Sequence, residues 1–202
     1  MFSKQSMKFG FKLIQRSDVA FTAGIPEKFG GHGVVKQAVL DGEIVAVKCP
    51  KDQCSLTERE FKKFVEELHV MASVCHPNCV MLRAACKDRN NPMYVMEWVG
   101  GGSLHEVLGK EEPLPCHVRL KNAREITSAV DYLHKCKIIH GDLKSLNVLL
   151  TPDFIAKICD FGSAIQTFNS TVNTKTGATN LHTTVHAQGQ NGGPRGKPID
   201  PS

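Results

Sequence analysis

The sequence lacks any long apolar run, because no segment approaches the ~20 consecutive apolar residues that a membrane-spanning helix needs. Residues 1–10 carry lysines at positions 4 and 8 but no apolar block follows them, so we expect no secretory signal. The eight cysteines form no Cys-X-X-Cys pair, a spacing typical of metal and redox sites. Together these absences predict a cytoplasmic protein in a reducing compartment.

The sequence also lacks a large excess of charge of either sign. The formal net charge is +5, and the lysines and arginines are spread along the chain. A nucleic-acid-binding surface would need a clustered basic face, and Lys62-Lys63 alone does not form one, so we expect no nucleic-acid partner. The 202 residues, 41% hydrophobic and 22% charged, are typical of a globular protein with one domain or two small lobes.

Four stretches of different character divide the chain. Residues 1–17 form a polar and aromatic lead-in, and residues 18–99 alternate strand-like runs with one helix. Residues 100–162 hold a second helix and two apolar runs, whereas residues 163–202 are rich in Thr, Asn, Gly, Gln and Pro. Because this last stretch has few large apolar residues and no periodicity, we expect a disordered tail beyond about its first dozen residues.

A hairpin is predicted early in the second stretch. Valine-rich runs at 34–40 and 43–48 flank Asp41-Gly42, a strong turn signal because both residues tolerate positive φ. Residues 93–99 predict a further strand.

The helix of the second stretch begins after Ser55 or Thr57. Each has a glutamate three residues later, which is the spacing of a capping box. The helical period then appears in an apolar stripe formed by Phe61, Phe64, Val65, Leu68, Met71 and Ala72.

The third stretch predicts a helix introduced by Pro113 and Pro115. Residues 147–150 and 155–159 predict two short strands joined by a turn at 151–153. The helix carries apolar residues at helical spacing, namely Leu120, Ala123, Ile126, Val130 and Leu133.

The motif His-Gly-Asp-Leu-Lys-Ser-Leu-Asn at residues 140–147 is followed by Asp160-Phe161-Gly162. In order, they supply a proton-accepting carboxylate, a cation, a carboxamide and a second carboxylate. Phosphoryl transfer needs such a set, because its catalysis consists mostly of positioning and of neutralising charge with cations and metal ions. The two motifs resemble the catalytic loop and the metal-binding loop of the eukaryotic protein kinase family.

This resemblance implies a role for each residue of the motifs. Asp142 would accept or orient the proton of the substrate hydroxyl, and Lys144 would stabilise the γ-phosphate. Asn147 and Asp160 would bind Mg²⁺, a hard cation that prefers oxygen ligands. Gly141 replaces the arginine that in many kinases pairs with a phosphorylated activation loop, so we expect that mode of switching to be lost and catalysis to be retained.

Three upstream elements extend the resemblance over residues 18–162. Residues 28–35 resemble the glycine-rich loop that covers phosphates, although Lys28 stands where the first glycine is expected. Val-Ala-Val-Lys at 45–48 resembles the strand whose lysine holds the α- and β-phosphates. Residues 96–99 resemble the hinge between lobes, with Met96 as gatekeeper and with backbone groups of Glu97 and Val99 facing adenine. The resemblance places around ATP the residues Gly30, Gly31, His32, Gly33, Val35, Ala46, Lys48, Met96, Glu97, Val99 and Leu149.

Helical periodicity selects the acidic partner that the family requires for Lys48. Glu67 lies one turn from both Phe64 and Met71, at the border of the apolar stripe, whereas Glu66 points away. We therefore predict that Glu67 pairs with Lys48.

The implied fold is α+β and protein-kinase-like. A small antiparallel-sheet lobe with one helix occupies residues 18–99, and the start of a mainly helical large lobe occupies residues 100–162. No Ala-Pro-Glu segment follows Gly162, so we expect a chain truncated within the activation segment at 163–202, an incomplete large lobe and a poorly covered apolar stripe in the second helix.

Two functions stay open. The first is an ATP- and Mg²⁺-dependent serine/threonine kinase acting on a protein substrate. Lys144, two places after Asp142, is typical of serine/threonine kinases, and the Gly-Ser-Leu after the hinge resembles their tyrosine-kinase-like branch. The second is a non-catalytic nucleotide-binding or interaction module that docks on a kinase or scaffold partner.

Overall fold

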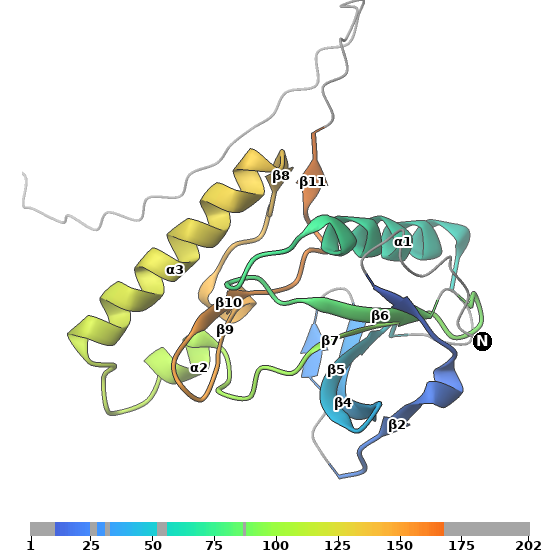
Figure 1. Ribbon diagram of the computed structural model, residues 1–202, viewed down its shortest axis with the longest axis horizontal. Helices are drawn as coiled ribbons and strands as arrows, with labels where there is room; N and C mark the ends of the chain where they lie inside the picture. Colours follow the sequence, from blue (N-terminus) through green and yellow to red (C-terminus); the bar gives the residue numbers. More distant parts are fainter. Residues whose placement is uncertain (1–10, 25–27, 31–32, 52–55, 87, 168–202) are drawn as a thin grey trace, which may run out of the picture. The chain divides into compact units, whose positions relative to one another are not determined.

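A computed structural model of the chain describes residues 11–24, 28–30, 33–51, 56–86 and 88–167 (Figure 1). Its first part is a curled sheet with the strand order β1-β6-β7-β5-β4-β2, and β3 is also paired with β4. All pairs are antiparallel except β1 with β6, as expected for an antiparallel small lobe. The strands are β1 (Lys12–Leu13), β2 (Val19–Phe21), β3 (Lys28–Gly30), β4 (Gly33–Leu40), β5 (Glu43–Cys49), β6 (Leu82–Cys86) and β7 (Met93–Glu97).

The predicted hairpin is confirmed. β4 and β5 pair in antiparallel register from Leu40↔Glu43 onward, and Asp41 and Gly42 form the turn with φ values of 53° and 84°. β7 confirms the strand predicted in residues 93–99. β1 lies within the predicted lead-in, and β6 was not predicted because its alanines carry little strand propensity.

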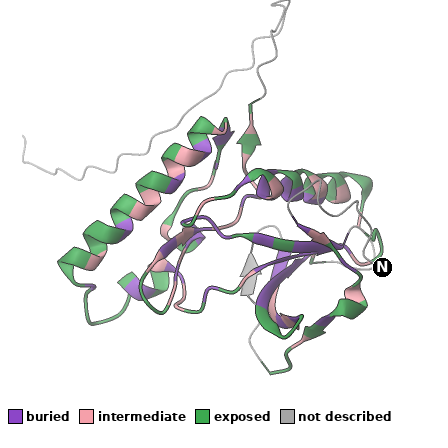
Figure 2. Ribbon diagram, viewed as in Figure 1, coloured by how far each residue is buried: buried purple, intermediate pink, exposed green. Residues whose placement is uncertain are grey.

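Helix α1 (Glu58–Ser73) begins at the capping box of Thr57. The Glu60 amide donates to Thr57 Oγ1 at 3.3 Å, and the Thr57 amide donates to Glu60 Oε2 at 2.9 Å. Ser55, the other candidate, lies outside the described residues. The helix packs against β6 and directs inward a buried face formed by Phe64, Glu67, Leu68, Val70 and Met71 (Figure 2).

The second part of the structure contains short strands and two helices (Figure 1). β9 and β10 pair antiparallel and confirm the predicted strands of residues 147–159. A second ladder, β8 with β11, was not predicted, because strands of two residues have no periodicity to read. The elements are α2 (Leu104–Leu108), α3 (Cys116–Lys135), β8 (Ile138–Ile139), the 3₁₀ turn η3 (Ser145–Asn147), β9 (Val148–Leu150), β10 (Ala156–Ile158) and β11 (Ile165–Gln166).

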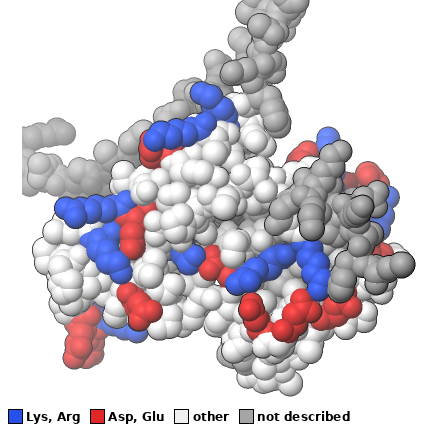
Figure 3. Space-filling model, in the orientation of Figure 1, with Lys and Arg blue, Asp and Glu red and all other residues white. Residues whose placement is uncertain are grey.

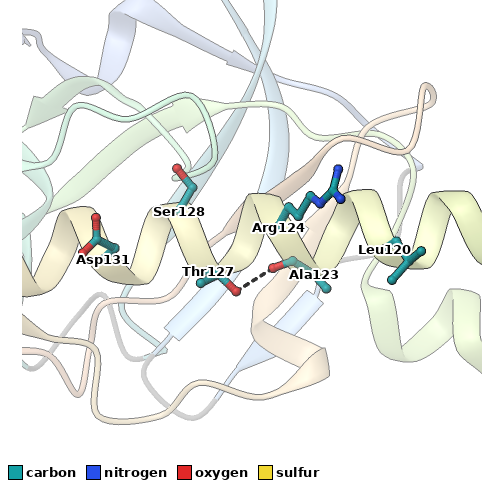
Figure 4. A pocket seen from close by; sticks show the side chains of 6 residues that line it. All are labelled: Leu120, Ala123, Arg124, Thr127, Ser128 and Asp131. Atoms are coloured by element: carbon teal, nitrogen blue, oxygen red, sulfur yellow. Dashed lines mark hydrogen bonds between the residues drawn. The ribbon is translucent and has the colours of Figure 1, made fainter.

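The apolar stripe predicted on α3 is covered at one end only. Leu133 is buried, Ile126 and Val130 are half-buried, and Leu120 and Ala123 are exposed. An open hollow on this exposed side contains no residue of the predicted site, and Figure 4 shows its lining of Leu120, Ala123, Arg124, Thr127, Ser128 and Asp131.

The buried face of α3 includes a polar residue, whereas two apolar residues of the predicted stripe are exposed. Asn122 is 3% exposed, and its Nδ2 donates to the Phe154 carbonyl at 2.7 Å. This hydrogen bond offsets part of the cost of burying an amide, so α3 turns Asn122 toward the turn between β9 and β10 while Leu120 faces outward. Among the described residues, no helix combines the length and apolarity needed to cross a bilayer.

A single hydrophobic cluster connects the sheet, α1 and the second part. It contains Leu68 of α1, Tyr94 of β7, Leu133 of α3, Ile158 of β10 and the buried Phe161. Burial of each large apolar side chain contributes ~1.5–3 kcal/mol. The segments that carry the predicted site residues are therefore fixed against one another by a shared core.

Candidate active site

Lys48 stands at the centre of the predicted site. Its Nζ donates to Glu67 Oε1 at 2.8 Å and to Asp160 Oδ1 at 2.9 Å. The side chains of Lys48 and Glu67 are 8% and 7% exposed, and that of Asp160 is 28% exposed. The structure thus brings together three predicted residues from β5, α1 and the segment after β10.

Opposing effects act on the charge of Lys48. Burial lowers its pKa by desolvation, but attraction to Glu67 and Asp160 and the hydrogen bonds to both outweigh burial, so the pKa is raised above its ordinary value. Lys48 therefore remains a cation between two carboxylates at neutral pH.

Tyr94 of β7 is a neighbour that sequence reasoning missed. Its hydroxyl donates to Glu67 Oε1 at 2.7 Å, so one carboxylate oxygen is held by both Tyr94 and Lys48. Burial, followed by the charge of Glu67, raises the pKa of Tyr94 well above its ordinary value. The cross-strand pair Lys48↔Tyr94 would have indicated this neighbour, but that register is known only once the sheet order is known.

The catalytic-loop motif forms a second, more exposed cluster. Lys144 Nζ donates to Asp142 Oδ2 at 2.7 Å, and these side chains are 49% and 37% exposed. Asn147 Nδ2 donates to the Asp142 carbonyl at 2.7 Å and to its Oδ2 at 3.1 Å. The hydrogen bond from Lys144 is the main reason why the pKa of Asp142 is lowered, with a smaller contribution from Asn147. Asp142 is therefore a carboxylate at neutral pH.

Hydrogen bonds tie the catalytic loop to the segment that carries Asp160. The Cys159 amide donates to the Asn147 carbonyl at 2.9 Å, and His140 Nε2 lies 2.9 Å from the Cys159 carbonyl. The His140 ring also contacts the ring of Phe161 at a centroid distance of 5.2 Å. Because Cys159 and Phe161 are both anchored, Asp160, with φ of 62°, is fixed from both sides.

Several of the residues that were predicted to surround ATP belong to one hydrophobic cluster. Ala46, Met96 and Val99 are buried in the same hydrophobic cluster, and Val35 and Leu149 pack against it. Gly30 and Gly33 face each other across β3 and β4, whereas Gly31 and His32 lie outside the described residues. At Gly33 a Cβ atom would lie 2.6 Å from the Cys49 carbonyl oxygen, so only glycine fits beside β5.

The predicted hinge is held by a contact that the sequence did not indicate. Glu97 Oε1 accepts from the Met81 amide at 2.8 Å and from Lys157 Nζ at 2.9 Å, and Lys157 also donates to the Pro77 carbonyl at 2.9 Å. The Glu97 amide donates to the Met81 carbonyl at 3.0 Å, so this N–H is already bonded within the protein. The next residue, Trp98, is 37% exposed and is the only tryptophan of the sequence.

Oxygen donors suited to Mg²⁺ lie at the border of the two clusters. Both Nδ2 hydrogen bonds of Asn147 go to Asp142, which leaves Oδ1 as the atom of this side chain that can bind a cation. The Asp160 carboxylate supplies further oxygen atoms, and such hard donors fit Mg²⁺. Elsewhere on the surface, acidic and basic side chains are interspersed over the face shown in Figure 3.

Comparison with known proteins agrees with this arrangement. The protein kinase domain family matches residues 29–184. A probable serine/threonine-protein kinase of Dictyostelium discoideum is 34% identical over 174 residues, which cover 86% of this chain and 19% of that protein.

Two plant proteins are also similar. Salt tolerance receptor-like cytoplasmic kinase 1 of Oryza sativa subsp. japonica is 36% identical over 75% of this chain and 45% of its own length. A receptor-like cytosolic serine/threonine-protein kinase of Arabidopsis thaliana is 40% identical over 67% of this chain and 30% of its own length. The chain spans less than half the length of each of these three relatives. The fold, the arrangement around Lys48 and the match over residues 29–184 lead to one conclusion, that the chain belongs to the protein kinase domain family.

Proposed function

We propose that the chain acts as an ATP-dependent protein serine/threonine kinase, which transfers the γ-phosphate of ATP to a hydroxyl group of a protein substrate. The observation that carries this proposal is the position of Lys48 between Glu67 and Asp160, at 2.8 Å and 2.9 Å. A cation held by a buried carboxylate on one side can bind phosphate oxygens on the other. The names of the relatives support serine/threonine specificity.

The nucleotide would be held from three directions. Val35, Ala46 and Leu149 would contact adenine, together with the hinge at residues 96–99, and Lys48 would bind the α- and β-phosphates. Asn147 Oδ1 and the Asp160 carboxylate would hold Mg²⁺. When bound, this ion offsets the charge of the phosphates and connects them to the protein.

Asp142 and Lys144 would act on the transferred group. Because the pKa of Asp142 is lowered, its carboxylate is ready to accept a hydrogen bond from the substrate hydroxyl and orient it. Lys144 would turn from Asp142 to the γ-phosphate and stabilise its charge. The exposure of both side chains, 37% and 49%, gives a substrate access to them.

The finer assignments belong to the same proposal. Lys144 supports the serine/threonine type, and the hinge with the Gly102-Ser103-Leu104 that follows it supports the tyrosine-kinase-like branch. The Ser103 hydroxyl caps α2 by accepting from the Glu106 amide at 3.1 Å. We place the small lobe and hinge at 18–99, the start of the large lobe at 100–162, and part of an activation segment after it. The cytoplasmic and cytosolic names of two relatives support a cytoplasmic location, where a kinase or scaffold protein could be a partner.

Nucleotide binding and phosphate transfer test the proposal in two steps. ADP with Mg²⁺ should raise the melting temperature of the 202-residue chain, and Asp160→Asn should remove most of the increase. Radiolabelled ATP should then label casein as a generic substrate, and Asp142→Asn should abolish labelling. Binding without transfer would favour the non-catalytic nucleotide-binding module. Absence of binding would overturn the kinase and leave only the interaction module.

A further inference from the structure

Tyr94 lies between two strands and a helix. It is paired with Lys48 in the register of β5 and β7, so the two side chains are on the same face of the sheet. The centroid of its ring is 5.7 Å from Lys48 Nζ and 5.4 Å from the ring centroid of Phe64 on α1. Tyr94 is only 1% exposed. Its side chain therefore connects the strand that carries Lys48 to the helix that carries Glu67.

The Tyr94 hydroxyl fixes one oxygen of the Glu67 carboxylate. It donates to Glu67 Oε1 at 2.7 Å, and Lys48 Nζ donates to the same oxygen at 2.8 Å. Tyrosine has two side-chain torsions and a rigid ring, so a packed tyrosine holds its hydroxyl in one place. Because burial raises the pKa of Tyr94, the hydroxyl keeps its proton and remains a donor at neutral pH. Glu67 thus has a fixed neutral partner in addition to a cation.

Nucleotide binding would change the partners of Lys48 but not that of Tyr94. Lys48 Nζ is shared between Glu67 and Asp160, which lies at 2.9 Å and is 28% exposed. In the proposed function Asp160 turns to Mg²⁺, and the ammonium is then shared between Glu67 and the phosphates. The Glu67 carboxylate is the partner that stays, so the place of its Oε1 decides where the ammonium lies.

We propose that Tyr94 is a positioning residue for Lys48, because its hydroxyl fixes the Glu67 oxygen that directs the ammonium toward the phosphates of the nucleotide. Tyr94 itself makes no contact with the nucleotide. This inference rests on the proposed function, since it assigns a further residue to the same phosphate-binding site. Loss of the hydroxyl should weaken the binding of phosphate groups and leave the binding of adenine unchanged.

Two phenylalanine variants separate this role from a general loss of packing. Tyr94→Phe removes the hydroxyl, and Tyr132→Phe is the matched control at the other tyrosine of the sequence, whose hydroxyl accepts from the Cys75 amide at 2.8 Å. NMR titration of the full chain measures the affinity for ADP with Mg²⁺ and for adenosine, which has no phosphate. In Tyr94→Phe we expect a ~10-fold loss for ADP and a change within about twofold for adenosine. Tyr132→Phe should change neither affinity.

A second comparison tests whether Tyr94 acts through Lys48. In a background of Lys48→Met with Glu67→Gln, the ammonium is absent, so adding Tyr94→Phe should change the affinity for ADP by no more than about twofold. A further ~10-fold loss in that background would overturn the proposal, because Tyr94 would then act by another route.

Two results of the first comparison would also overturn the inference. One is an unchanged affinity of Tyr94→Phe for ADP, and the other is an equal loss for ADP and adenosine. If the unmodified chain does not bind ADP, the proposed function fails instead. The position of Lys48 is then tested without nucleotide, since the ¹⁵N signal of its ammonium should shift in Tyr94→Phe and not in Tyr132→Phe. An unchanged signal would refute the positioning role.

The unmodified chain provides a test if Tyr94→Phe does not fold. The hydroxyl proton of Tyr94 should exchange slowly with water, both in the free chain and with ADP and Mg²⁺ bound, because its hydrogen bond to Glu67 persists. Slow exchange in both states would support the proposal. Fast exchange of this proton after ADP binds would contradict it, since Glu67 would then hold Lys48 without help from Tyr94.

Discussion

Two charged clusters of the site differ in their relation to water. The buried cluster consists of Lys48, Glu67 and Tyr94, and its ion pair is 8% and 7% exposed. The loop cluster consists of Asp142, Lys144 and Asn147, and its ion pair is 49% and 37% exposed. A buried pair that loses one partner leaves an uncompensated charge, whereas an exposed pair is screened by water. The buried cluster therefore couples the site to folding, and the loop cluster is left to act on a substrate.

Removal of Lys48 should have the largest effect on stability. In Lys48→Met the buried Glu67 loses its cation. We expect the free energy of unfolding, measured by urea denaturation at pH 7, to fall by ~3–5 kcal/mol. The control is Lys48→Met with Glu67→Gln, which removes both charges, keeps an acceptor for the Tyr94 hydroxyl and should recover most of the loss. A double variant as unstable as Lys48→Met would show that the pair does not act through its charge.

Removal of the Tyr94 hydroxyl should have a smaller effect. Tyr94→Phe keeps the ring but takes one hydrogen bond from Glu67, whose Oε1 still accepts from Lys48 at 2.8 Å. We expect a loss of ~1–3 kcal/mol in the same denaturation experiment, because the bond is buried and its acceptor is charged. An unchanged urea midpoint would show that the hydrogen bond from Tyr94 to Glu67 does not stabilise the fold.

Alkaline pH should remove the stability that the buried cluster contributes. The pKa values of Tyr94 and Lys48 are both raised on folding, so their stabilisation is present below their ordinary pKa values of 10.0 and 10.5 and is lost as the pH rises beyond them. The urea midpoint should be nearly flat from pH 8 to 9.5 and should fall toward pH 11. Tyr94→Phe should show a shallower fall, and an identical slope would refute this assignment.

Changes in the loop cluster should hardly affect stability. Asp142→Asn alters an exposed side chain, so we expect the free energy of unfolding to change by less than ~0.5 kcal/mol at pH 7. Phosphate transfer should nevertheless fall by ~10²–10⁴-fold, because the asparagine cannot accept the proton that the carboxylate orients. A large loss of stability would contradict the conclusion that only the buried cluster contributes strongly to folding.

Local signals in the sequence predicted local structure well. Asp41-Gly42 specified its turn, Thr57 its cap, and the helical period placed Glu67 on the inner face of α1. Each of these features depends on residues a few positions apart, so the local sequence is enough to predict it. The protein-kinase-like fold followed from the order of the motifs, and the match of residues 29–184 supports it.

Features that depend on distant pairing were not predicted. Tyr94 reaches Glu67 only because β7 lies next to β5, and Lys157 reaches Glu97 across 60 residues. The burial of Asn122 on α3 depends on the Phe154 carbonyl, which no helical period reports. The ladder of β8 with β11 is too short to be predicted from the sequence. The roles of the individual site residues stay predictions, which the variants above would test.

The hinge carries its own optical probe. Trp98 lies between Glu97 and Val99, is 37% exposed, and is the only tryptophan in the chain. Its intrinsic fluorescence therefore comes from a single place, next to the backbone groups proposed to face adenine. Titration of the unlabelled protein with ADP should shift the emission, so that occupancy of the hinge can be followed in solution without a fluorophore attached to either partner.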